Sequence, residues 1–172
     1  DYAKALPAAA ALELIHNFSL IHDDIQDGDR ERHSRETLWA VWGQGKALIA
    51  GNAMRTIADL SLLRFEKDVI NVEKNVGALV ILTGRYLEMI EGQYLDLSFE
   101  SRLDVLPEEY LGMIGKKTAA LLEASMHIGA YCATDNPDQL VALRRCGYSL
   151  GLAFQIRDDY LGVWGDETTI GK

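Results

Sequence analysis

The sequence predicts an all-α fold, a bundle of long antiparallel helices around a central cavity. Only three prolines occur in 172 residues, and apolar residues recur at intervals of three or four, as in Leu12, Ile15 and Phe18. Such spacing gathers apolar side chains on one face of a helix, whereas a strand would alternate them. A hydrophobic content of 48% supports one buried core, so residues 1–172 are expected to form a single domain.

Apolar spacing, together with residues typical of turns and helix starts, predicts the helices. The apolar run Val76–Leu82 lies inside a predicted helix and Leu60–Leu63 near the end of another. Asp104 before Pro107 suits a first helical turn, and Asn136–Pro137 is a turn followed by a helix start. The predicted helices span about residues 8–28, 44–65, 72–98, 107–133 and 138–164.

Charge and cysteine content narrow the function. A formal net charge of -9 argues against a nucleic-acid surface, which needs clustered Lys and Arg, and favours divalent cations as partners. Cys132 and Cys146 form neither a disulfide framework nor a metal motif, which favours a reducing cytoplasm. No signal peptide and no apolar run of membrane-spanning length is seen. The chain begins at Asp1 without a methionine, so we expect a bundle incomplete at both ends.

The sharpest chemical feature is an acidic cluster in the first predicted helix. Asp23 and Asp27 are four residues apart and project from the same helical face, with Asp24 beside them. Two carboxylates on one face repel one another, so a positive partner is expected to offset them. One interpretation is a cation site, and the other is a solvated acidic face paired to Arg30 and Arg32.

A second acidic cluster in the last predicted helix favours the cation site. Asp158 and Asp159 are adjacent in an otherwise apolar helix. If both helices face one cavity, carboxylates from two sides suit Mg²⁺, which completes its coordination shell with water and substrate phosphate oxygens. Such a site would bind a metal diphosphate, and the metal would stabilise charge on a departing diphosphate. Candidate cations for the phosphates are Arg30, Arg32, Arg35, Lys116, Lys117 and Lys172.

Five segments, taken in order, resemble the motifs of trans-polyprenyl diphosphate synthases. The first, ELIHNFSLIHDDIQD, is similar to that family's first aspartate-rich motif. Five collinear matches are far more specific than one aspartate pair in an acidic helix. The five segments are Glu13–Asp27, Glu91–Leu97, Lys117–Thr118, Phe154–Asp166 and Gly171–Lys172.

The resemblance implies an all-α isoprenoid-synthase fold, a homodimer, and roles for individual residues. It implies that Asp23 and Asp27 bind two Mg²⁺ and Asp158 a third, with Asp24 and Asp159 in support. Arg32 matches the first of the family's paired arginines, and His33 stands where the second is usual. Further substrate-binding candidates are Gln93, Asp96, Lys117, Thr118, Phe154, Gln155 and Lys172.

The implied reaction joins an allylic diphosphate to isopentenyl diphosphate. The allylic diphosphate ionises, the double bond of isopentenyl diphosphate attacks the carbocation, and a proton is lost to the released diphosphate. Lys117 and the five aspartates are the catalytic candidates, and no side-chain base is required.

The sequence also departs from the family pattern. His33, Asn52 and Gly162 replace an arginine and two aspartates, and an amino-terminal element for isopentenyl diphosphate is absent. A non-catalytic or regulatory homologue that binds diphosphates therefore stays open. A class I terpene cyclase is the weaker alternative, because its usual second metal motif is not found around Asp158.

Product length is predicted from the helix that precedes Asp23. On an ideal helix Ser19, His16 and Leu12 lie about 6, 10 and 16 Å along the same face. Ser19 is too small to block a growing chain, and Phe18 with Ser19 resembles geranylgeranyl-type rather than farnesyl-type synthases. Geranylgeranyl diphosphate is the expected product, although Phe18 could equally be an ordinary core residue.

Overall fold

The computed structural model describes residues 5–63 and 72–165 of the chain. The first half contains α1 (Leu6–Asp27), β1 (Glu31–Arg32), β2 (Arg35–Glu36), α2 (Leu38–Trp42) and α3 (Gln44–Leu63). The second half contains α4 (Val72–Phe99), α5 (Pro107–Ile114), the π-helical segment η2 (Gly115–Ala119), α6 (Ala120–Ala133) and α7 (Pro137–Trp164).

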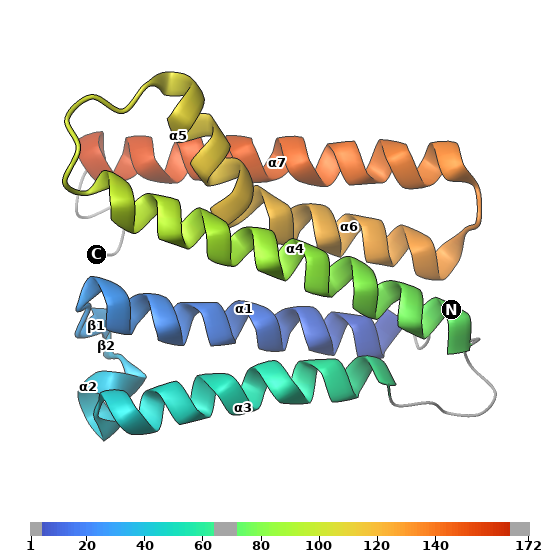
Figure 1. The fold of residues 1–172 in the computed structure, drawn as a ribbon, viewed down its shortest axis with the longest axis horizontal. Helices are drawn as coiled ribbons and strands as arrows, with labels where there is room; N and C mark the ends of the chain where they lie inside the picture. Colours follow the sequence, from blue (N-terminus) through green and yellow to red (C-terminus); the bar gives the residue numbers. More distant parts are fainter. Residues whose placement is uncertain (1–4, 64–71, 166–172) are drawn as a thin grey trace.

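The long helices run side by side and alternate in direction (Figure 1). α1 packs on α3, α4 packs on α6, and α6 packs on α7. This arrangement confirms the predicted all-α fold, and the predicted helix ends agree within a few residues. Three features differ from the prediction. The β1–β2 hairpin and α2 were expected as a connection, and the helix predicted at 107–133 is divided into α5, η2 and α6.

The core between α1, α3, α4 and α6 is built from small and branched side chains. Ile15, Leu82 and Ile128 are almost fully buried, from three different helices. Ala11 and Ala58 are fully buried as well, so α1 and α3 approach closely. Close packing of such surfaces excludes water and supplies most of the stability of a helical bundle.

A buried carboxylate ties three helices together at the middle of the bundle. Glu123 of α6 is 4% exposed, and its oxygens accept a hydrogen bond from Arg144 of α7 and lie 3.5 Å from Arg85 of α4. Two arginines compensate the desolvation of this carboxylate, because an unpaired buried charge would be strongly destabilising. The ion pairs fix how α4, α6 and α7 lie against one another.

The ends of the helices follow from residues at their boundaries. Gly28 adopts a left-handed conformation with φ 73° and ends α1 directly after Asp27. The Asn136 side chain accepts hydrogen bonds from the backbone N–H groups of Asp138 and Gln139 at the start of α7. These boundaries place the carboxyl ends of α1, α4 and α7 at one end of the bundle, beside α5 and the hairpin (Figure 1).

Within residues 5–63 and 72–165, no helix combines the length and the apolar character that a membrane span needs.

Candidate functional site

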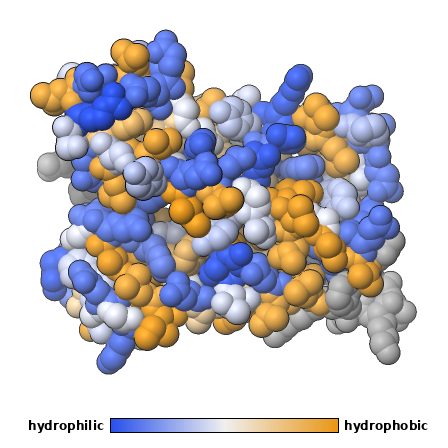
Figure 2. Space-filling view, viewed as in Figure 1, coloured by the Kyte–Doolittle hydropathy of each residue, from blue (hydrophilic) through white to orange (hydrophobic). Residues whose placement is uncertain are grey.

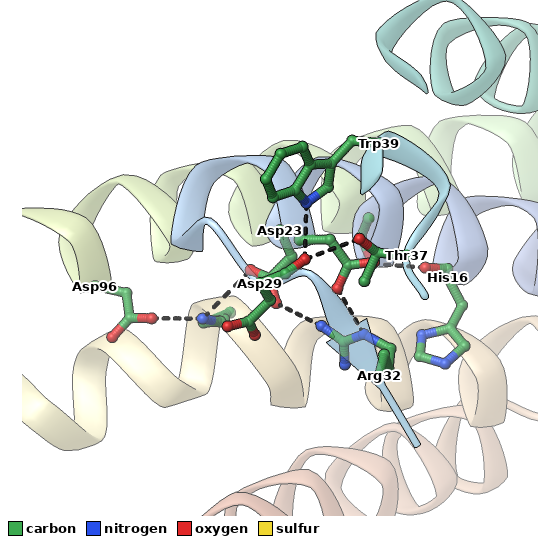
Figure 3. A network of polar contacts seen from close by, with 10 residues as sticks. His16, Asp23, Asp29, Arg32, Thr37, Trp39 and Asp96 are labelled. Atoms are coloured by element: carbon green, nitrogen blue, oxygen red, sulfur yellow. Dashed lines mark hydrogen bonds and ion pairs between the residues drawn. The ribbon is translucent and has the colours of Figure 1, made fainter. Parts of the chain in front are cut away.

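The first acidic motif lies at the carboxyl end of α1 and contacts the hairpin (Figure 3). Asp24 is 5% exposed, and one of its carboxylate oxygens accepts a 2.7 Å hydrogen bond from Nε of Arg32. A terminal guanidinium nitrogen of Arg32 lies 3.5 Å from Asp23. The expected pairing of the motif with an arginine is therefore present for Arg32, whose hydrogen-bond partner is the buried carboxylate of Asp24.

Arg30, the other arginine considered as a partner for the motif, instead lies against an aromatic ring. Its guanidinium carbon is 5.3 Å from the centre of the Trp39 ring. The backbone oxygen of Asp29 accepts hydrogen bonds from the Trp39 indole, at 2.7 Å, and from the Thr37 hydroxyl, at 2.8 Å (Figure 3). These contacts hold the hairpin and α2 against the end of α1.

Lys117 of η2 connects the first acidic motif to α4. Its ammonium group donates a hydrogen bond to Asp96 of α4 and lies 3.6 Å from Asp23 of α1. Burial by itself would lower the pKa of Lys117, but the hydrogen bond to Asp96 and the charges of Asp23 and Asp27 outweigh it, so the pKa is raised. Lys117 is therefore charged at every physiological pH and screens the carboxylates around it.

Close backbone contacts place η2 between α4 and α7. Gly92 of α4 lies so near that a β-carbon there would overlap the Lys117 backbone, and one on Gly151 of α7 would overlap Ala119. Glycine is the residue type that allows backbones to approach this closely. A π-helical turn shifts the side chains that follow it, and here consecutive side chains point to different helices, Lys117 towards α4 and α1 and Thr118 towards α7.

The second acidic motif is joined to η2 by a chain of hydrogen bonds. The Thr118 hydroxyl donates to Gln155 of α7 at 2.6 Å. The Gln155 amide then donates to Asp159 at 2.8 Å. The other oxygen of Asp159 accepts a 2.5 Å hydrogen bond from the Tyr110 hydroxyl of α5. Both acidic motifs thus contact consecutive residues of one short segment.

The acidic residues create a local excess of negative charge. Burial, followed by the neighbouring charge of Asp23, raises the pKa of Asp27 from 3.8 to about 6, although Lys117 acts in the opposite direction. A bound cation would relieve this repulsion, and carboxylate oxygens are the ligands that Mg²⁺ prefers. Asp23 and Asp27 could therefore hold Mg²⁺, and Asp158, the third ligand that the resemblance implies, is exposed on α7.

The described residues contain no group of three or more Asp, Glu, His or Cys side chains close enough to hold a metal by themselves. Mg²⁺ differs from many metals in that one or two carboxylates can bind it, with water and phosphate completing its coordination. The side-chain amide of Gln93 is a further group that a ligand could contact. Its amide nitrogen is buried without a hydrogen-bond partner in the described part of the chain, one turn before Asp96 on α4.

An open pocket of about 490 Å³ lies between α1 and the hairpin. Its polar lining is Asn17, Arg32, His33, Arg35 and Thr37 together with the carboxylates of Asp24 and Glu36, and its apolar lining is Leu20, Ile21 and Leu38. Positive and hydrogen-bonding groups at such a position suit a phosphate. Two predicted substrate residues, Arg32 and His33, therefore share one pocket.

The residues predicted to control product length lie on two faces of α1. Phe18 is buried, with its ring centre 4.4 Å from that of His22 and 5.6 Å from that of Tyr86. The Ser19 hydroxyl donates to the backbone oxygen of His16, which is exposed. Leu12 is half-buried. Phe18 therefore packs towards α4, as its interpretation as a core residue expects.

Two predicted substrate residues lie apart from these contacts. Phe154 is on α7 with 55% of its surface exposed, and Lys172 lies outside the described residues. Sequence reasoning also missed Tyr110 and Gly92. Tyr110 is 49 residues from the aspartate that it contacts, so no local pattern could have indicated the pair, whereas Gly92 inside a motif was an available signal for close backbone approach.

Comparison with known proteins gives a consistent family. The profile described as polyprenyl synthetase matches residues 1–172. A short chain isoprenyl diphosphate synthase of Methanothermobacter thermautotrophicus is 43% identical over 100% of this chain and 52% of its own length. The crystal structure of geranylgeranyl pyrophosphate synthetase from Pyrococcus horikoshii superposes with a TM-score of 0.94 at 41% identity, covering 100% of this chain and 52% of that one.

A third similar structure is that of a complex with ligands. The polyprenyl synthase from Caulobacter crescentus, complexed with calcium and isoprenyl diphosphate, has a TM-score of 0.89 and 33% identity, covering 100% of this chain and 50% of that one. The chain thus spans about half the length of the relatives that it matches. The match over every residue confirms the resemblance read from the motifs, and the chain belongs to the polyprenyl synthetase family.

Proposed function

We propose that the protein containing this chain is a trans-prenyltransferase. It condenses an allylic diphosphate with isopentenyl diphosphate to give a short-chain, all-trans prenyl diphosphate. In this reaction the allylic carbon–oxygen bond breaks, a carbon–carbon bond forms from the double bond of isopentenyl diphosphate, and a proton leaves. Family membership and the polar contacts around Lys117 and Thr118 support the proposal.

One observation carries the proposal. Asp23 and Asp96 both contact the Lys117 ammonium group. Thr118, the next residue, is joined through Gln155 to Asp159 by hydrogen bonds. The two aspartate-bearing helices therefore both connect to η2, which carries the Lys117 ammonium group and the Thr118 hydroxyl. A diphosphate held there could reach metal ions on both sides and a lysine between them.

We propose Mg²⁺ as the cofactor, with three ions held by Asp23, Asp27 and Asp158. Mg²⁺ would act as a Lewis acid towards the charge that develops on the departing diphosphate. The hard oxygen donors of the site suit this ion, and the Caulobacter relative has calcium and isoprenyl diphosphate bound. The raised pKa of Asp27 is a further sign of excess negative charge that a cation would offset.

The chain's own residues would orient the allylic diphosphate. Lys117 presents a fixed positive charge, because its hydrogen bond to Asp96 restrains the ammonium group. Thr118 and Gln155 present a hydroxyl and an amide that already bond to one another, so little ordering is needed when a phosphate replaces one partner. Gln93, with its unpartnered buried amide, is a further candidate donor.

We propose that the pocket between α1 and the hairpin receives the phosphates of isopentenyl diphosphate. Arg32 there is already paired with Asp24, so its guanidinium plane is fixed before a ligand arrives. His33 follows in the turn and supplies a weaker donor than a second arginine would.

Geranylgeranyl diphosphate is the product that we propose. Ser19 is small and lies on the same face of α1 as Asp23, so a prenyl tail that runs along this face meets no bulky group there. Exposed His16 and half-buried Leu12 continue that face.

We also propose a homodimer in the cytoplasm. The exposed apolar residues of α4 recur at spacings of three, four or seven positions, and Figure 2 shows apolar side chains across the middle of this face. Those on α4 are Val72, Val76, Val80, Leu87, Ile90 and Tyr94. Cys132 and Cys146 are both free thiols, as a reducing compartment permits.

Two observations favour a second candidate, a non-catalytic homologue that binds diphosphates. Arg32 is engaged with Asp23 and Asp24, and His33 occupies a tight turn where the family has arginine. In such a protein diphosphate would bind without condensation.

The deciding experiment uses the full-length protein with Mg²⁺, radiolabelled isopentenyl diphosphate and geranyl or farnesyl diphosphate, with chain-length analysis of products. A labelled C20 prenyl diphosphate supports the proposal. Binding of the diphosphates without any product, from either primer, would leave the non-catalytic homologue.

A further inference from the structure

We propose that Tyr110 is a positioning residue for the second acidic motif: its hydroxyl holds Asp159 inside the protein, so that Asp158 is the carboxylate presented to the metal diphosphate. This inference rests on the proposed function of the site. It assigns different tasks to two adjacent aspartates and brings in a residue outside the recognisable motifs.

The geometry separates the two aspartates. Both carboxylate oxygens of Asp159 already accept hydrogen bonds, at 2.5 Å from the Tyr110 hydroxyl and at 2.8 Å from the Gln155 amide. The Asp158 side chain is exposed, and it makes no hydrogen bond or ion pair with any residue of 5–63 and 72–165. Neighbouring side chains on a helix point about 100° apart, so a bond that restrains how α7 is turned against α5 at Asp159 also restrains the side of α7 on which Asp158 lies.

Tyr110 is held rigidly enough to do this. The helix that carries it, α5, begins after a loop that is fixed by Arg102, which donates to both oxygens of Glu109, at 2.8 and 3.2 Å, and to Asp104 at 3.0 Å. Glu109 also accepts from the backbone N–H of Leu106 at 2.9 Å. A side chain on an anchored helix can orient another group, whereas one on a free loop cannot.

The hydrogen bond lies in a partly buried setting. Burial and then Asp159 raise the pKa of Tyr110, so its hydroxyl keeps its proton and remains a donor at any pH at which the protein is folded. Through Asp159 the tyrosine also restrains Gln155, which accepts from Thr118. The chain of hydrogen bonds from α5 to η2 thus orients Asp159 and Gln155 together.

The test measures binding, so it does not depend on turnover. The full-length protein, Tyr110→Phe and Asp159→Asn are titrated by calorimetry with inorganic pyrophosphate at a series of Mg²⁺ concentrations. Removing a group that orients a metal ligand weakens metal affinity by roughly 10-fold, so Tyr110→Phe should need about 10-fold more Mg²⁺ for half-maximal pyrophosphate binding. Tyr131→Phe, a tyrosine near the carboxyl end of α6 whose ring contacts Lys74, is the matched control and should bind as the unaltered protein does.

A double variant separates positioning from a general structural effect. If Tyr110 acts through Asp159, the Tyr110→Phe and Asp159→Asn double variant should bind no more weakly than Asp159→Asn alone. Additive losses would overturn the inference, and so would unchanged Mg²⁺ dependence in Tyr110→Phe or absence of Mg²⁺-dependent pyrophosphate binding by the unaltered protein.

The same set of proteins distinguishes this inference from the proposed function. Normal product formation with an unaltered Mg²⁺ dependence in Tyr110→Phe would refute the positioning role alone. Pyrophosphate binding that depends on Tyr110, without product from any primer, would support the positioning role and refute the prenyltransferase.

Discussion

The Lys117 ammonium nitrogen lies 3.6 Å from an Asp23 carboxylate oxygen, and this contact joins η2 to the carboxyl end of α1. The same positive charge offsets part of the rise in the pKa of nearby Asp27 that burial and Asp23 cause. Lys117→Met should therefore raise the pKa of Asp27 above about 6, because one compensating charge is lost. Carboxylate NMR titration of the two proteins measures this shift.

Lys116→Met is the matched control for that titration. Lys116 is the neighbouring lysine, and it pairs with Glu91 at 2.7 Å, away from Asp27. The Asp27 pKa should stay unchanged in this variant. Equal shifts in both variants would mean that net charge, and not the position of Lys117, sets the Asp27 pKa.

Asp27→Asn should make the protein more stable at pH 8 and change little at pH 4. The folded-state pKa of Asp27, about 6, is above its ordinary value of 3.8, so the folded protein binds this proton more tightly than the unfolded chain does. The stabilisation by that proton is complete below pH 4 and is lost as the pH rises through 6. After allowance for solvent screening, the gain from Asp27→Asn at pH 8 is about 1 kcal/mol.

Urea denaturation at the two pH values measures the difference. Mg²⁺ with pyrophosphate should remove the advantage of the variant at pH 8, because bound cations would then stabilise the aspartate. An equal difference in unfolding free energy between the two proteins at both pH values would show that ionisation of Asp27 does not destabilise the fold.

Ser34→Gly should stabilise the β1–β2 hairpin. His33 and Ser34 form its two-residue turn with φ 49° and 59°, a left-handed conformation that suits glycine and strains other residues. The expected gain in unfolding free energy is about 0.5–1 kcal/mol. Thermal and urea denaturation measure it.

Ser125→Gly provides the opposite case, because Ser125 is exposed in the interior of helix α6. That variant should lose about 0.5 kcal/mol, since glycine is less favourable than serine inside a helix. A loss of stability in Ser34→Gly as well would indicate that the turn is not strained.

Gly92→Ala should displace η2 and weaken pyrophosphate binding. A β-carbon on Gly92 would overlap the backbone of Lys117, so the helices must separate at a cost of roughly 1–3 kcal/mol. Gly84→Ala, in the same helix with open space around it, should instead gain up to about 1 kcal/mol from helix propensity. Urea denaturation and pyrophosphate titration of both variants measure these effects. Equal stability and equal pyrophosphate binding in Gly92→Ala and Gly84→Ala would contradict the predicted displacement of η2.

Ser19→Phe should shorten the product of the full-length protein. An aromatic ring on the Asp23 face of α1 would block the path expected for the prenyl tail, about one helical turn from the motif. Ser61→Phe on α3 is the control, because Ser61 makes the same kind of backbone hydrogen bond on a different helix. An unchanged product distribution in Ser19→Phe would place the tail elsewhere.

Several features of the fold follow from short stretches of sequence. The all-α class and the helix ends near Gly28 and Asn136 were predictable, because apolar spacing and capping residues act within a few positions. The hairpin was not, since its turn residues His33 and Ser34 are poor left-handed formers. Its geometry depends on contacts with α1 and α2, which no local pattern records.

The family and the two acidic motifs can be read directly from the chain, because each depends on residues at neighbouring positions. The partners of the motif residues are visible only in the folded molecule: Arg32 on Asp24, Lys117 between Asp96 and Asp23, and Tyr110 on Asp159. The pairs of Lys117 and Tyr110 join helical segments that are far apart in the chain. Their distances depend on how closely glycine and alanine allow the helices to pack.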